Sequence, residues 1–151
     1  MADLVLKNAK MVTPFGVREG GIAIENEKIV AIGVDNSLPS APEVIDCRGM
    51  LMLPGVFDPH VHLGGRTPYE ENIVTETTSA AAGGVTAFLQ YLRSADPEYK
   101  VVKERIDFAS KLSLIDTSFH FIVSGLEQAK DIENFSKKFE ISTFKFYMGG
   151  Y

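Results

Sequence analysis

The chain has 151 residues, of which 45% are hydrophobic and 23% are charged, so it is long enough to bury a hydrophobic core. Its formal net charge of −5 disfavours a nucleic-acid or anionic-membrane surface, because both require clustered Lys and Arg. No apolar run reaches membrane-spanning length, and the first residues lack a signal-peptide pattern. Cys47 is the one cysteine and excludes an internal disulfide. We therefore expect a cytoplasmic protein.

Residues 1–53 have the pattern of a small β domain. Short apolar runs typical of strands occur at 4–6, 21–25, 28–32 and 44–46. Asn26 and Glu27 separate two of these runs and predict a hairpin turn, because Asn tolerates left-handed backbone. Two prolines within residues 36–42 predict a loop.

Residues 54–151 alternate between strand and helix patterns. Apolar strands are predicted at 56–63, 85–89, 118–123 and 142–148, and helices at 70–82 and 126–139. A further helix is expected to open at Asp96-Pro97, a cap residue followed by Pro at the first helical position. This alternation predicts an α/β fold with a parallel sheet. A full (β/α)8 barrel takes about 250 residues, so we expect the first four strands of a TIM-type barrel, apparently truncated.

The strongest chemical signal is the run Asp58, His60 and His62. These residues stand at i, i+2 and i+4 on a predicted strand, which places their side chains on one face. Two imidazoles in this arrangement can bind one metal ion, and Asp58 could orient a ring or complete the ligand shell. The pattern alone also suits a partly exposed strand, but its place at the carboxyl end of an apolar α/β strand favours a site.

Lys145 stands between two phenylalanines in a predicted apolar strand. A lysine there is costly unless it is neutralised, paired or extended to solvent. A buried lysine can also react with carbon dioxide to give a carbamate that bridges two metal ions, and we take this as a hypothesis. We interpret His120 as a hydrogen-bonded core residue, because no second ligand stands at suitable spacing. Arg66 could contact substrate or be solvated.

Several motifs together resemble the amidohydrolase superfamily. Residues 54–63, PGVFDPHVHL, resemble the opening barrel strand of that superfamily. Residues 80–86 and 143–148, AAAGGVT and TFKFYM, are similar to the next landmarks of its cyclic-amidohydrolase branch, which includes D-hydantoinase (dihydropyrimidinase), dihydroorotase and allantoinase. The motifs occur in the family's order, after a leading β unit, and together they extend along the whole chain. By resemblance, residues 1–53 are a portion of a small β-sandwich and residues 54–151 are the first half of the barrel.

The resemblance implies a metal-dependent hydrolase that opens a cyclic amide by attack of metal-bound hydroxide. His60 and His62 would bind zinc, and carbamylated Lys145 would bridge two zinc ions. Two further histidines and an acid/base aspartate come from later strands in the family, so these 151 residues are expected to be inactive alone. A homo-oligomer, a tetramer or a dimer, is expected for the full-length protein.

The substrate is less well indicated than the reaction. Dihydroorotases carry an arginine after the His-x-His-Leu stretch, where this chain has Gly64, which disfavours dihydroorotate unless Arg66 replaces that arginine. Dihydropyrimidinases and hydantoinases place a tyrosine five residues after the bridging lysine, whereas here Tyr151 is one residue late. Tyr151 and Arg66 are therefore the candidate substrate contacts, and hydantoins, dihydropyrimidines and allantoin-like ureides all stay open.

Two alternatives to a cyclic amidase were considered. Metal-dependent deoxyribonucleases and phosphoesterases also open with His-x-His, but they begin at that strand and use a glutamate in place of Lys145. Dihydropyrimidinase-like scaffold proteins keep the fold and have lost metal ligands. Retention of His60, His62 and Lys145 favours an enzyme over a scaffold.

Overall fold

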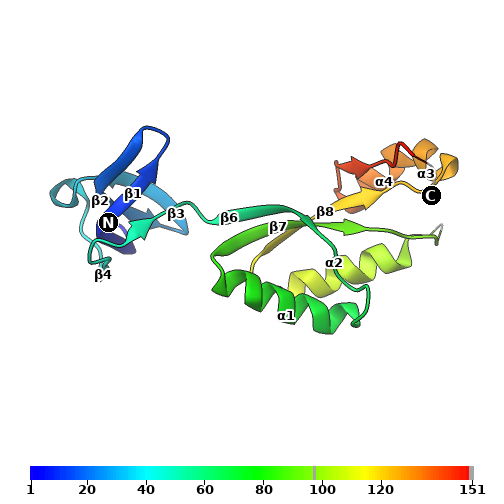
Figure 1. Ribbon diagram of the computed structural model, residues 1–151, viewed down its shortest axis with the longest axis horizontal. Helices are drawn as coiled ribbons and strands as arrows, with labels where there is room; N and C mark the ends of the chain where they lie inside the picture. Colours follow the sequence, from blue (N-terminus) through cyan, green and yellow to red (C-terminus); the bar gives the residue numbers. More distant parts are fainter. Residues whose placement is uncertain (97, 150–151) are drawn as a thin grey trace. The chain divides into compact units, whose positions relative to one another are not determined.

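The computed structural model describes residues 1–96 and 98–149. The chain divides into two compact units, Met1–Pro54 and Gly55–Tyr151. Figure 1 shows the strands of the first unit in blue and cyan and the alternating strands and helices of the second in green to red. Among the described residues, no helix is long and apolar enough to cross a membrane.

Within its described residues the first unit is a five-stranded sheet. Strands β1 (Leu4–Thr13), β2 (Gly16–Glu25) and β3 (Lys28–Gly33) are antiparallel neighbours. Strands β4 (Glu43–Asp46) and β5 (Leu51–Met52) both pair with β1 in parallel, and a 3-10 turn, η1 (Asp35–Ser37), precedes β4. One face buries Ala2, Val5 and Ala23. The interpretation of this sheet as a portion of a sandwich stays a prediction.

The hairpin between β2 and β3 follows the sequence prediction. Asn26 and Glu27 form its two-residue turn, and both have positive φ, 49° and 62°. Such left-handed pairs match the twist of the flanking strands. The backbone N–H of Asn26 also donates to the Asp3 carboxylate at 2.7 Å, which fixes the turn to β1.

The second unit contains a parallel sheet in the order β6-β7-β8-β9 along its described residues. The strands are β6 (Val56–Val61), β7 (Val85–Leu92), β8 (Asp116–Ile122) and β9 (Phe144–Lys145). Strand order therefore follows chain order, as successive βα units produce. The expected mixed α/β class and parallel sheet are confirmed, whereas their being half of a barrel stays a prediction.

Helices α1 (Tyr69–Ala82) and α2 (Lys100–Leu112) lie on one side of β6 and β7 (Figure 1). Phe88 of β7 packs there with Ile73 of α1 and Ala109 of α2. Buried and partly exposed side chains alternate along β7, so Phe88, Gln90 and Leu92 face the helices. Leu89 and Tyr91 lie on the opposite face, which those two helices leave uncovered.

Three predicted element boundaries were wrong. Helix α2 begins at Lys100 rather than at Asp96; Asp96 instead accepts hydrogen bonds from the backbone N–H groups of Glu98 and Lys100. The helix expected at 126–139 is broken into α3 (Leu126–Lys130) and α4 (Ile132–Phe139). The break is at Asp131, whose carboxylate accepts a hydrogen bond from the Tyr99 hydroxyl at 3.2 Å.

The strand expected at 142–148 is limited to Phe144–Lys145. It bonds to β8 through Phe121 N–H to Thr143 O and Val123 N–H to Lys145 O. Strand β8 ends at Ile122, so Phe146 to Met148 have no strand beside them and lie partly or fully exposed.

Candidate metal centre

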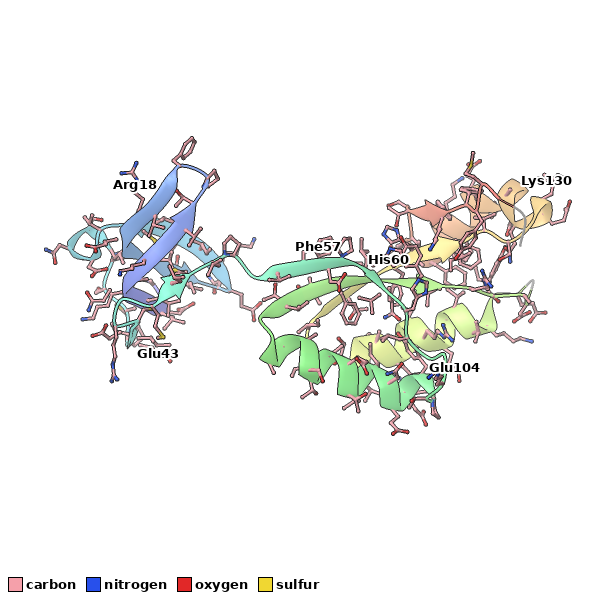
Figure 2. All side chains as sticks on the ribbon, viewed as in Figure 1. Arg18, Glu43, Phe57, His60, Glu104 and Lys130 are labelled. Atoms are coloured by element: carbon pink, nitrogen blue, oxygen red, sulfur yellow. The ribbon has the colours of Figure 1, made fainter. Side chains whose placement is uncertain are left out.

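His60 and His62 converge at the carboxyl end of β6. Figure 2 labels His60 on this strand, beyond Phe57. The Nε2 atoms of the two rings lie 3.2 Å apart, and the ring centroids lie 5.2 Å apart. Two nitrogens bound to one tetrahedral zinc ion, each about 2.0–2.1 Å from it, lie about 3.3–3.4 Å apart. The donor spacing therefore suits a single metal ion.

The hydrogen bond of Asp58 goes to the backbone of His60, whereas side-chain alternation predicted a contact with an imidazole ring. Asp58 Oδ1 accepts a hydrogen bond from the backbone N–H of His60 at 3.0 Å. The register of β6 on β7 shifts between Asp58 and Val61, around Pro59, which has no N–H to donate. Because of this irregularity, simple alternation does not extend from Asp58 to His60. Asp58 acts on the backbone that carries His60.

Lys145 comes to the same face of the sheet from β9. Its Nζ lies 4.4 Å from the ring centre of Tyr91 and 4.9 Å from that of Tyr147. Tyr91, on β7, also contacts His60 and His62, with ring centroids 4.5 Å and 5.0 Å away. The structure therefore gathers His60 and His62, from the end of β6, and Lys145, from β9, around Tyr91 of β7.

Electrostatics favour the neutral form of the His62 imidazole. Partial burial lowers the pKa of His62 below its ordinary value, and the positive charges of Lys145, His60 and Arg93 lower it further. A lowered pKa favours the unprotonated ring, which is the form that binds a metal ion. No group of three His, Cys, Asp or Glu side chains suited to a metal is present in the described parts of the chain. The residues present thus fit the two-imidazole part of a site.

His120 is not the hydrogen-bonded core residue that the sequence indicated. It lies on β8 beside Tyr91, is partly exposed, and its ring centroid is 4.9 Å from that of Tyr91. No hydrogen bond of its ring is found within residues 1–96 and 98–149. Burial, and then the charge of His60, lower the pKa of His120. Its face of the sheet is the one that α1 and α2 do not cover.

Arg66 and Tyr151 are the two candidate substrate contacts. Arg66 is exposed, in the loop between β6 and α1, where it stays a prediction. Tyr151 lies outside the described residues. A cleft of about 550 Å³ is lined by Arg93, Ser124, Phe146 and Tyr147 among others. It borders the cluster, because the Tyr147 ring is also in contact with Lys145.

The loop after His62 is tied to helix α1, and α1 is tied to β7. Gly64 N–H donates to Asn72 Oδ1 at 2.8 Å, and the Tyr69 hydroxyl donates to Gln90 Oε1 at 2.8 Å. Gly64 has φ 74°, and a Cβ there would lie 3.1 Å from Arg105 Nη2. An arginine at this position would therefore need a backbone conformation that side chains rarely adopt.

Sequence reasoning missed Tyr91, which contacts all three predicted metal-site residues. The available signal was the alternation in residues 85–92, which places Tyr91 on the face opposite Gln90. The strand was predicted only over 85–89, so Tyr91 fell outside it, whereas β7 extends to Leu92. Only the sheet order β6-β7-β8 brings His60 and His120 to its two sides.

Several enzymes with related names are similar to this chain in sequence or in structure. An allantoinase of Desulfitobacterium hafniense is 37% identical over 123 residues, covering 78% of this chain and 27% of that protein. A dihydroorotase of Methanosarcina acetivorans is 32% identical over 138 residues, covering 87% of this chain and 29% of the relative. A crystal structure of D-hydantoinase superposes with a TM-score of 0.82 at 27% identity, covering 99% of this chain and 34% of that one.

The chain belongs to the cyclic amidohydrolase branch. The resemblance inferred from the motifs is thereby confirmed. No family model matches the chain. The chain spans about a third or less of the length of these cyclic amidohydrolases. The activity and substrate of the whole protein are therefore proposed below. The allantoinase and the dihydroorotase have similar sequence identity to this chain, 37% and 32%. Sequence identity therefore does not distinguish between their substrates.

Proposed function

We propose that this chain supplies the first metal-binding strand and the bridging lysine of a hydrolase that opens a cyclic amide. The substrate class is a hydantoin, a dihydropyrimidine or a related ureide ring. The observation that carries the proposal is the 3.2 Å approach of the His60 and His62 Nε2 atoms at the carboxyl end of a parallel strand, where α/β enzymes hold their sites.

In this proposal His60 and His62 hold a zinc ion through their Nε2 atoms. Asp58 supports them by its hydrogen bond to the His60 backbone. Bound zinc supplies an activated water and a Lewis acid for the amide carbonyl. Arg66 and Tyr151 stay candidates for contacts to the substrate.

Lys145 has a separate role, as the bridge to a second zinc ion. Its neutral amine adds to the carbon of carbon dioxide, and the nitrogen then releases one proton to water. The resulting carbamate carries a negative charge and two oxygen donors. The position of Lys145 supports this role, because its Nζ lies 4.4 Å from the centre of the Tyr91 ring, which also contacts the His60 and His62 rings.

The 151-residue chain is proposed to bind metal without hydrolysing amides. Its described residues offer two imidazoles but no group of three His, Cys, Asp or Glu ligands. Within the described residues, each Nε2 atom has the other imidazole, and no acid/base carboxyl group, at hydrogen-bonding distance.

The test is ring opening by the protein isolated at the length that its source produces. Hydantoin, dihydrouracil, allantoin and dihydroorotate are supplied with zinc and bicarbonate, and the open-chain product is measured. Opening of at least one ring, lost in His60→Asn, is expected. Absence of opening with all four, in a preparation that has bound zinc, would contradict the proposal.

A further inference from the structure

The Tyr91 ring is the one feature of β7 that touches every side chain of the proposed metal centre. Its centroid lies 4.5 Å from that of His60 and 5.0 Å from that of His62. Lys145 Nζ lies 4.4 Å from the same ring centre. His60 and His62 lie at the end of β6 and Lys145 lies on β9, so Tyr91 joins parts of the site that are far apart in sequence.

The contact with His62 is a stack, with an angle of 15° between the rings. An imidazole lone pair lies in the ring plane, so fixing the plane fixes the direction in which Nε2 can donate. The His60 ring is tilted by 48° on Tyr91 and by 50° on His62. Tyr91 thus packs against both rings while their Nε2 atoms meet.

Metal-binding histidines are commonly oriented by a hydrogen bond from the other ring nitrogen to a carboxylate, carbonyl or water. Along the part of the chain that the structure describes, neither Nδ1 atom has a hydrogen-bond partner, and Asp58 is bonded to backbone instead. Within the same residues the Tyr91 hydroxyl has none either. The aromatic ring of Tyr91, rather than its hydroxyl, contacts the two imidazoles and can orient them.

We propose that Tyr91 is a positioning residue of the metal centre, and that its aromatic ring holds the His60 and His62 imidazoles toward a single divalent zinc-like ion. This inference rests on the proposed function. It assigns to ring stacking the orienting task that a hydrogen bond performs elsewhere. It also predicts that phenylalanine replaces Tyr91 without loss, whereas an aliphatic residue does not.

The test is binding of Co²⁺, followed by its visible absorption, to the metal-free protein and to three variants. Tyr91→Phe should bind within about threefold of the parent protein, and Tyr91→Leu should bind about 10- to 100-fold more weakly, the range for loss of an orienting partner. Leu89→Ala is the matched control, because Leu89 lies on the same face of β7, and it should leave affinity unchanged. Thermal unfolding without metal checks that each variant is folded.

A second measurement keeps the inference testable if Tyr91→Leu does not fold. Proton NMR of the metal-free parent protein should show the His62 ring protons shifted by the stacked ring, and the shift should persist in Tyr91→Phe. Unshifted His62 protons, or equal Co²⁺ affinity in Tyr91→Leu and the parent, would overturn the role of Tyr91 alone. A folded parent protein that binds no Co²⁺ would instead overturn the proposed function, and this inference with it.

Discussion

The Nε2 atoms of His60 and His62 lie 3.2 Å apart. His60 is in β6, and His62 directly follows the last residue of that strand. Neither nitrogen is enclosed, since both side chains are exposed. Two unprotonated nitrogens at this distance repel each other through their lone pairs unless a proton or a cation lies between them. A shared proton, as in a hydrogen bond from one ring N–H to the other ring, and a shared cation both relieve this repulsion, and the proposed metal ion is the second of these.

The first prediction is that each histidine is needed for metal affinity. His60→Asn or His62→Asn removes one of two strong donors, and the dissociation constant for Zn²⁺ should rise by about 100-fold or more, beyond the effect of losing an orienting partner. Equilibrium dialysis measures it. His120→Asn is the control, because His120 contacts Tyr91 but is not a proposed ligand. An equal loss in His120→Asn would show that the site is not specific to His60 and His62.

The second prediction concerns Lys145. Protein supplied with zinc and ¹³C-labelled bicarbonate should give one carbamate carbon resonance by NMR. Lys145→Arg should lack that resonance, because guanidinium does not add to carbon dioxide, while retaining the positive charge above the Tyr91 ring. A carbamate resonance that survives in Lys145→Arg would assign the modification to another amine.

The third prediction is that two adjacent glycines in the loop after His62 differ in how well they tolerate replacement by alanine. Gly64→Ala should lower the free energy of unfolding by about 1–2 kcal/mol, because its φ of 74° is unfavourable for a residue with Cβ. Gly65→Ala should have little effect, since its Cβ would have no neighbour within 4 Å. Urea unfolding of the two variants measures the difference, and equal losses would contradict the described loop conformation.

The closeness of the candidate residues His60 and His62 could be predicted from the sequence, whereas the ring that contacts them was not predicted. Alternation along one strand is a local property, so His60 and His62 could be placed together from spacing alone. Tyr91 was not found, because the strand predicted at 85–89 ended before it, whereas β7 extends to Leu92. His120 was misread because its strand is apolar, although the residue itself lies on the face that α1 and α2 leave uncovered. At the break between α3 and α4, Asp131 accepts a hydrogen bond from Tyr99, 32 residues away, a contact that local sequence does not predict.

The fourth prediction is a pH dependence that comes from Tyr69. Burial raises the pKa of Tyr69 to about 12, with the Gln90 hydrogen bond and Arg105 acting in the opposite direction. The folded pKa is above the unfolded value of about 10, so the unfolded chain loses this proton first. The stabilisation is complete below pH 10 and is lost as pH rises through the folded pKa.

Tyr69→Phe tests this dependence by removing both the ionisable group and the hydrogen bond to Gln90. Gln90 is fully buried, and its Nε2 already lacks a partner among the described residues. The variant should lose about 1–3 kcal/mol at neutral pH and show a shallower decline in unfolding free energy between pH 10 and 12. Parallel pH profiles for the variant and parent would show that another group controls alkaline unfolding.

The shared metal ion at His60 and His62 is tested most directly by X-ray absorption at the zinc edge of the zinc-loaded protein. We predict scattering from two imidazole nitrogens at about 2.0–2.1 Å, which disappears when both His60 and His62 are replaced by Asn. Zinc that retains imidazole scattering undiminished in the double variant, or shows none in the parent protein, would contradict a metal centre at the end of β6.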